Sequence, residues 1–275
     1  MISIGTYGFF VQNLSFAIST PLYLFMHLLT SPTSKPYNSA HASSDLFLST
    51  YDLAIIPISV SLGYVIPSLL IILPANAPIG SPMHQYLVAF WQAFPLWTVL
   101  IQWTLKLACT FILGKDMAAK TEKSPQTAAS KTYLNYAGRV YTFVLALCMA
   151  THLPAVMLSL LPPGTVPQSI PALAYLARPS FTSTFIPPLP LGQPIQNMAE
   201  GVHIFLLWDM YIGSASGLLW AIVLYQNVSM GKQITASNVS LLAKLIIWTV
   251  LGGPVAAWTI LMWERDEVVK QKVKA

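Results

Sequence analysis

The chain has 275 residues, of which 55% are hydrophobic and only 8% are charged, and its mean hydropathy is +0.62. Soluble domains carry about 25% charged residues, so a water-exposed surface of ordinary composition is excluded. The net charge of +5 at pH 7 is small and lies mostly in one loop and the C-terminal tail, which does not indicate nucleic-acid binding. The apolar runs are long and continuous, and this predicts helices that cross a lipid bilayer.

Six apolar segments are long enough to cross about 30 Å of hydrocarbon. They run over Tyr7–Leu29, Leu53–Leu73, Tyr86–Leu113, Val140–Leu161, Val202–Gln226 and Val239–Trp263. The first has no basic residue before it and no small-residue cleavage site after it, so we expect a retained helix rather than a signal peptide. Both cysteines lie within apolar runs, and they predict neither a disulfide nor a thiolate metal site.

The positions of the basic residues predict how the chain is oriented in the membrane. Lysines gather in the loop Gly114–Asn135 and again in the tail after Glu264, and the positive-inside rule places both in the cytosol. Only three spans separate them, which would put them on opposite sides. A broken crossing in the Pro-rich stretch Gln168–Leu191 would resolve this conflict and predicts about seven transmembrane helices; the alternative is six spans with a luminal Pro-rich lid. The sequence shows no internal repeat, so one helical membrane domain over residues 1–275 is expected.

Carboxylates inside membrane spans are costly and are therefore candidate catalytic residues. Asp209 lies about 12 Å inside its span by the helical rise. Gly213 and Gly217 follow on the same face, and this spacing lets another helix approach closely. We therefore expect Asp209 to point into the bundle as a buried acid. The alternative is a structural partner for a neighbouring Tyr, Trp or Asn.

Two further acids are weaker candidates. Glu200 has His203 one turn later near the membrane boundary, and the pair is either functional or merely interfacial. Asp52 precedes its span, where it is either a third acid or a first-turn residue that stabilises the helix N-terminus. The tail acids Glu264, Asp266 and Glu267 are interpreted as a solvated helix end.

Aromatic residues are more numerous than lipid contact requires, and their ring faces can stabilise a cation. Most of them are expected to be packing or interfacial residues, and a histidine in a bundle is more often a structural residue than a ligand. The expected substrate-binding residues are Trp208, Tyr211, His203, Trp91, Trp103 and His152.

The sequence contains no DDxxD, DxDD, HExxH, P-loop, GxSxG or CxxC motif. Neither a metal nor a cofactor is therefore expected, and any catalysis would have to depend on proton transfer.

Four segments resemble the fungal membrane-bound terpene cyclases, and most closely the ascofuranone-cyclase type. They are PLYLFMHLLTSP (Pro21–Pro32), IPISVSLGYVIPSLLIILP (Ile56–Pro74), HQYLVAFWQAFPLW (His84–Trp97) and FLLWDMYIGSASGLLWAIVLY (Phe205–Tyr225). The sharpest element is the pair Trp208 and Asp209. The resemblance implies a metal-free isomerisation in which a carboxylic acid protonates the terminal epoxide of a prenylated aromatic or polyketide substrate.

This resemblance implies an enzyme integral to the bilayer of the endoplasmic reticulum. Its expected substrate is a hydrophobic prenylated molecule, and it is expected to associate with other enzymes of its pathway. One alternative is a small transporter or a lipid-binding membrane protein that uses the same acids as proton or ligand sites. Another is a non-catalytic scaffold. Proton-coupled transport would need carboxylates on several helices, whereas here they concentrate in one.

Overall fold

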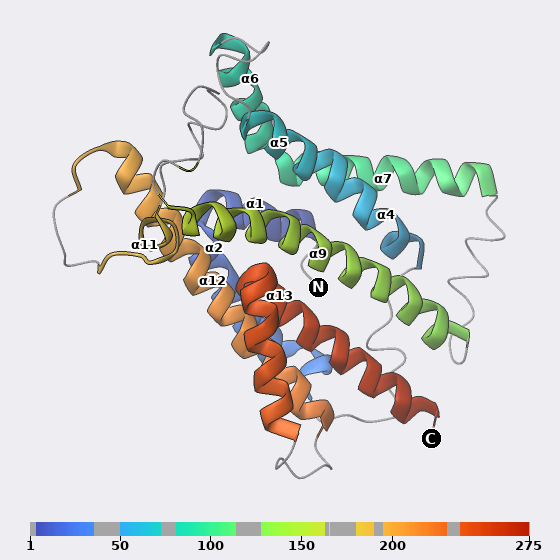
Figure 1. The fold of residues 1–275 in the computed structure, drawn as a ribbon. Helices are drawn as coiled ribbons and strands as arrows, with labels where there is room; N and C mark the ends of the chain where they lie inside the picture. The colour runs from blue at the N-terminus through green and yellow to red at the C-terminus, as the bar shows by residue number, and fades with distance from the viewer. Residues whose placement is uncertain are drawn as a thin grey trace.

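The computed structural model describes residues 4–35, 50–72, 81–113, 128–162, 165, 180–189, 195–229 and 237–274, and its regular elements in these ranges are all helical (Figure 1). In chain order they are α1 (Ile4–Leu14), α2 (Phe16–Thr30), the 3-10 turn η1 (Pro32–Ser34), α4 (Thr50–Val60), the π-helical turn η2 (Ser61–Val65), α5 (Ile66–Ile72), α6 (Ser81–Gln92), α7 (Phe94–Leu113), α9 (Ala128–Leu160), α11 (Phe181–Phe185), α12 (Met198–Ser229) and α13 (Ser237–Lys274).

Five helices in the described residues are long and apolar enough to cross a membrane. They are Tyr51–Ile72, Phe94–Ile112, Leu134–Leu160, Met198–Ser229 and Val239–Val269. Large apolar side chains lie exposed along them, as a bilayer requires; Phe111 and Ile112 near the end of α7 are 91% and 79% exposed. The predicted class, an all-helical integral membrane protein, is confirmed.

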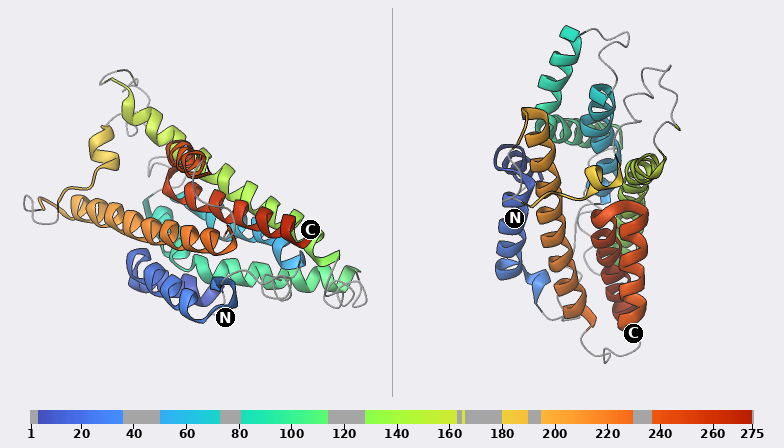
Figure 2. Two further views of the ribbon diagram at one scale, coloured as in Figure 1. Left: turned by 90° about the horizontal axis from the view of Figure 1, so that it is seen from below. Right: turned by 60° about the vertical axis from the view of Figure 1, so that its left-hand side comes forward.

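Helix α12 occupies the middle of the larger layer. Both views of Figure 2 show it between α2 on one side and α13 with α9 on the other. Ala221 and Leu224 of α12 and Leu261 of α13 are fully buried where these helices meet. The second layer is formed by α4, η2 and α5 against α6 and α7, and α4 also packs on α9.

The predicted span Tyr7–Leu29 is wrong as one continuous helix. Ser15 adopts φ 91°, which ends α1, and α2 then folds back beside it. The Tyr7 hydroxyl lies 2.6 Å from Thr20 Oγ1, and the ring centroids of Tyr7 and Tyr23 are 4.9 Å apart. Residues thirteen positions apart in a straight helix would be separated by about 20 Å. The segment is therefore a helical hairpin.

The predicted segment Tyr86–Leu113 is also interrupted, at the junction of α6 and α7. Pro95 has no backbone N–H and cannot bond to the carbonyl four residues earlier. The chain turns there, with the Leu96 N–H bonded to the Ala93 carbonyl at 2.9 Å, and only α7 is long enough to cross a membrane.

The last predicted span, Val239–Trp263, reverses direction in its middle. Gly253 has φ 75° and ψ 178°, and Pro254 begins a second arm (Figure 1). Lys244 on the first arm forms an ion pair with Glu264 on the second, although twenty residues separate them. A straight helix would hold these residues about 30 Å apart. Helix α13 is thus two arms packed side by side with both ends on the same side of the molecule, so it has the length and composition of a membrane crossing without being one straight span.

The reversal in α13 changes the number of membrane crossings needed to place the basic loop and the C-terminal tail on one side of the membrane. The Tyr141 hydroxyl in the first half of α9 donates to Asp266 Oδ2 at 2.8 Å, and a Cβ at Gly252 would lie 3.2 Å from the Cβ of Cys148, so the C-terminal arm runs antiparallel to α9. The start of α9, which follows the basic loop in the sequence, and the end of α13 therefore point to one end of the bundle without requiring a crossing in the stretch Gln168–Leu191. Most of that stretch, and residues 114–127 of the loop, lie outside the described residues.

We accordingly expect reporters inserted in the 114–127 loop and joined after Ala275 to report the same side of the membrane, the cytosol. Glycosylation-tag or fluorescence-protease mapping would measure this. Opposite sides for the two reporters would contradict the hairpin arrangement of α13.

Gly253→Ala is expected to destabilise the protein by about 1–2 kcal/mol, because a side chain is disfavoured at positive φ. A Cβ at this position would also lie only 3.3 Å from His152 Nδ1. The thermal unfolding midpoint in detergent would show the loss. Gly138→Ala is the matched control: its Cβ would meet nothing nearer than Trp263 at 3.8 Å, and its midpoint should stay unchanged or rise. Equal midpoints for both variants would contradict the assignment of Gly253 as the turning point.

Candidate functional site

Helices α2 and α12 run parallel, and polar contacts join them along their length. Trp220 Nε1 donates to His27 Nδ1 at 3.1 Å, and Asn227 Nδ2 donates to the Ser34 carbonyl at 2.6 Å. Both partners advance by seven residues between these contacts, as two parallel helices in register would do. Continuing this register toward the start of α12 brings Asp209 to the first turn of α2.

Asp209 caps the N-terminus of α2. Its Oδ1 accepts a hydrogen bond from the Ala17 N–H at 2.7 Å. The first backbone N–H groups of a helix lack partners within the helix, and a preceding Ser side chain often supplies one. Here Ser15 makes no such bond, and the carboxylate of another helix takes its place. No other described group bonds to Asp209 Oδ2. The carboxyl group is therefore fixed through one oxygen and has the other available.

The sequence predicts that another helix brings its backbone close to Gly213 and Gly217, but each of these glycines is met by an aromatic side chain instead. A Cβ at Gly213 would collide with Cδ1 and Cε1 of Phe16, and a Cβ at Gly217 would collide with the indole of Trp258. The backbone of α12 is thus covered by one ring from α2 and one from α13. Asp209 points toward α2 inside the bundle as predicted, but it is half-buried rather than buried, and its partner is a backbone N–H rather than a Tyr, Trp or Asn side chain.

Glu200 performs a capping role at the start of α12. Its Oε2 accepts the Gln196 N–H at 2.7 Å, and Asn197 Oδ1 accepts the Glu200 N–H at 3.0 Å. The Asn197 side chain thus satisfies one free donor of the helix start, and the Glu200 side chain ties the residue before the cap to the first turn. His203 does not join it: its Nε2 lies 2.7 Å from the Ser183 carbonyl. The predicted pair of Glu200 and His203 is not formed.

Asp52 lies in the first turn of α4, as one of its two interpretations expected, and is ion-paired. Lys106 Nζ of α7 lies 2.9 Å from its Oδ2, and Gln102 Nε2 donates to its backbone carbonyl at 3.0 Å. Ser59 donates to Gln102 Oε1 at 2.7 Å, which extends the network between α4 and α7. This carboxylate therefore stabilises the contact between two helices.

The predicted substrate-binding residues fall into three places, and none of these is centred on Asp209. Four of them surround residues 180–189. Trp208 Nε1 donates to the Pro188 carbonyl at 3.1 Å, the Tyr211 hydroxyl donates to the Phe185 carbonyl at 2.6 Å, and the ring of His152 meets that of Phe185 at 5.5 Å; His203 is the fourth. At about 100° per residue, Trp208 and Tyr211 lie well around the helix from Asp209.

The other two candidates lie on the second layer. Trp91 donates to Ser68 Oγ at 2.9 Å, and its ring packs with those of Tyr64 and Phe94. Trp103 is 61% exposed on the outside of α7, where it faces lipid. The structure therefore does not bring either tryptophan to Asp209.

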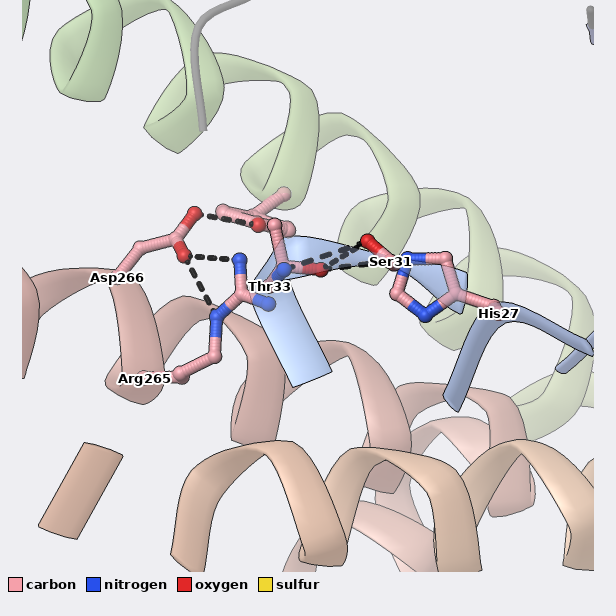
Figure 3. A network of polar contacts seen from close by, with 6 residues as sticks. His27, Ser31, Thr33, Arg265 and Asp266 are labelled. Carbon is pink, nitrogen blue, oxygen red and sulfur yellow. Dashed lines mark hydrogen bonds and ion pairs between the residues drawn. The ribbon is translucent and has the colours of Figure 1, made fainter. Parts of the chain in front are cut away.

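The interpretation of the tail acids as a solvated helix end is wrong for Asp266. Asp266 is 1% exposed and Arg265 is 6% exposed. Arg265 Nε and Nη2 donate to Asp266 Oδ1 at 3.0 and 2.6 Å, and Tyr141 donates to Oδ2 (Figure 3). Figure 3 shows Arg265 reaching toward Thr33 of η1.

The sequence contains a pattern that indicates the burial of Arg265 beside Asp266. Leu261, Arg265 and Val269 follow one another at four-residue spacing, and all three are buried. The buried face of α13 thus continues past the end of its apolar run. Because Asp266 is held by a buried cation, it is a structural charge. Asp209 differs from it, since its hydrogen-bond partner is the backbone N–H of Ala17.

Among the described residues, no three His, Cys, Asp or Glu side chains gather as a metal site would require.

Comparison with known proteins identifies relatives along nearly the whole chain. The family model described as the CtvD domain matches residues 2–270. Terpene cyclase ascI of Acremonium egyptiacum is 28% identical over 278 residues, which cover 98% of this chain and 64% of that protein. Terpene cyclase ctvD of Aspergillus terreus is 25% identical over 93% of this chain and 65% of its own length. Terpene cyclase atmA of Aspergillus flavus is 24% identical over 86% and 60%, respectively.

The resemblance drawn from the four sequence segments is confirmed by these matches. The chain spans about three fifths of the length of the curated relatives it matches. No solved structure matches.

Proposed function

Because this chain belongs to the CtvD domain family, we propose that it is a terpene cyclase that protonates the terminal epoxide of a prenylated meroterpenoid without a metal ion. The observation that carries the proposal is the geometry of Asp209, a carboxyl group fixed through Oδ1 with Oδ2 available. Relatives named terpene cyclases support the reaction class. Its place in the cell is the endoplasmic reticulum membrane, where a prenylated substrate enters from the bilayer and other enzymes of the pathway meet it.

In the protonated carboxyl group, Oδ1 keeps its bond from the Ala17 N–H and Oδ2 carries the proton. The proton passes from Oδ2 to the epoxide oxygen, and the bond from that oxygen to the more substituted carbon breaks. This leaves a hydroxyl group and a carbocation, onto which the olefins close. Loss of a proton from the last cation makes the product an isomer of the substrate.

The N-terminus of α2 supports this step. Helix N-termini carry a partial positive charge, and a carboxylate beside one is stabilised by roughly 0.3–1 kcal/mol at exposed sites and more where it is partly buried. Asp209 is half-buried, so the negative charge left after proton transfer meets a fixed donor rather than water. A fixed donor needs no reorganisation at the moment of reaction.

Substrate choice tests the proposal. Microsomes that contain the chain should convert a prenyl phenol with a terminal epoxide into a cyclic product of unchanged mass, and should leave the same prenyl phenol without the epoxide intact. Conversion of both, or of a prenyl diphosphate in their place, would overturn the proposal.

Cyclisation is expected to survive chelation. A proton donor replaces the metal in this mechanism, so EDTA should leave the rate unchanged and added Mg²⁺ should not raise it. Product formation before and after dialysis against EDTA measures this. A rate that falls on chelation and returns with Mg²⁺ would show that a metal takes part.

A further inference from the structure

We infer that Phe16, the first residue of α2, is a catalytic residue whose ring stabilises the carbocation that forms beside Asp209. This inference rests on the function proposed above. It assigns the next step, stabilisation of the cation, to a residue outside the predicted substrate-binding set.

The bend between α1 and α2 meets α12 at two neighbouring points. Ala17 donates its N–H to Asp209 Oδ1, and the preceding residue, Phe16, places its ring on Gly213. Cγ of this ring would lie 2.8 Å from a Cβ at Gly213. Asp209 and Gly213 are four residues apart on one face of α12, which is about 6 Å along the helix axis. The acid and the ring are therefore held side by side by one short segment of backbone.

This separation suits the charge that the reaction creates. Protonation at the epoxide oxygen opens the bond to the adjacent carbon, so the positive charge develops one bond from the atom that receives the proton. A cation is attracted to an aromatic face within about 6 Å of the ring centroid. A substrate oxygen at Asp209 Oδ2 thus brings its cation within range of Phe16.

Phe16 differs in its surroundings from the aromatic residues that have structural roles. Trp258, the ring on Gly217, packs into the buried cluster of Leu224 and Leu261. Phe16 is half-buried and does not belong to that cluster. Its ring is shielded by α12 and still stands at the side of the acid, where a cation close to it would be poorly hydrated. Cation–π attraction is strongest for desolvated charges.

Fluorination of the ring tests the inference without changing its size appreciably. The chain would be made with phenylalanine, monofluoro-, difluoro- and trifluorophenylalanine at position 16, and cyclisation of the epoxide would be timed in liposomes. Each fluorine weakens the negative ring face, so the rate should fall stepwise and by roughly 10-fold over the series. A rate that stays constant across the series would overturn the role of Phe16.

Two controls separate charge from packing. The same series at Phe10, an exposed ring on the same hairpin, should leave the rate unchanged; a parallel fall there would overturn the inference by showing a general effect of fluorine. Phe16→Leu keeps apolar bulk without a π face, and it should lower kcat by roughly 10-fold at an unchanged thermal midpoint. A Leu variant with wild-type kcat would also overturn the inference.

Comparing Asp209→Asn with the fluorine series at Phe16 separates the role of the acid from the role of the ring. If Asp209→Asn abolishes cyclisation while the fluorine series at Phe16 is flat, the acid stands and the ring does not act. If Asp209→Asn cyclises at the wild-type rate, or if the wild-type chain converts no epoxide, the proposed function fails and the inference fails with it.

Discussion

Replacing Asp209 with Asn is expected to lower the cyclisation rate by roughly 10²–10⁴-fold, the usual contribution of a general acid. In this structure the substitution removes the proton donor without removing the cap of α2. The amide oxygen of Asn can still accept the Ala17 N–H that now bonds to Oδ1, so the cap of α2 is kept. The amide cannot deliver a carboxylic proton. Initial rates in membranes, normalised to the amount of folded protein, measure the effect.

Asp209→Ala serves as the comparison, because it removes the proton donor and the cap together. Loss of a helix cap costs about 1 kcal/mol. The Ala variant should therefore be as inactive as the Asn variant and less stable than it. An Asn variant that cyclises at the wild-type rate would show that Asp209 is a capping residue alone, and one that unfolds like Ala would show that the cap depends on the carboxylate charge.

Asp266→Ala is expected to have the largest effect on stability, with a loss of about 3–5 kcal/mol. Arg265 is 6% exposed and directs two of its nitrogens to Asp266 Oδ1. Removing the carboxylate takes from the buried guanidinium the oxygen to which two of its nitrogens donate, and it also removes the Oδ2 to which the Tyr141 hydroxyl donates. The thermal midpoint in detergent and the yield of folded protein measure this loss.

The pair of Lys244 and Glu264 provides the matched control on the same helix. Both side chains are more exposed, at 51% and 27%, and exposed ion pairs contribute about 0–1 kcal/mol. Glu264→Gln should therefore change the midpoint little. If Asp266→Ala proves as mild as Glu264→Gln, the buried network does not hold α13 against α9.

Local sequence patterns predicted the interior face of α12 correctly. Asp209 with Gly213 and Gly217 at four-residue spacing indicated a close helix contact, and rings from α2 and α13 lie on those glycines. Spacing along one helix is local information, which is why it could be read from the sequence. The identity of the partner could not: the Ala17 N–H comes from a residue 192 positions away and carries no side-chain signature.

The sequence did not predict the two chain reversals, at Ser15 and at Gly253. Serine commonly precedes a helix, but a positive φ is uncommon for it, so the sequence did not predict the reversal at Ser15. The reversal at Gly253 has a visible signal in the pair Gly253 and Pro254, which lies inside the predicted span Val239–Trp263. Hydropathy measures the apolar length of a segment, and a hairpin and a crossing of the same composition look alike to it.

Of the candidate site, the sequence predicted Asp209 but not Phe16. The acid lies on a helix whose apolar stretch could be recognised, whereas Phe16 is one of 12 phenylalanines in an apolar sequence. Only the fold at Ser15 brings it beside Asp209. Four of the predicted substrate-binding residues instead contact residues 180–189, three through backbone carbonyls and His152 through its ring. The spacing of residues along the sequence does not predict such contacts.

The fate of the epoxide oxygen tests the central claim most directly. The purified chain, reconstituted in metal-free liposomes, would be given a farnesyl phenol whose terminal epoxide carries ¹⁸O. Protonation followed by ring closure keeps this oxygen as a hydroxyl group, so the account predicts a cyclic product with the mass of the labelled substrate and full retention of ¹⁸O. A product that has lost the label or gained an oxygen from water, or a substrate recovered unchanged, would contradict it.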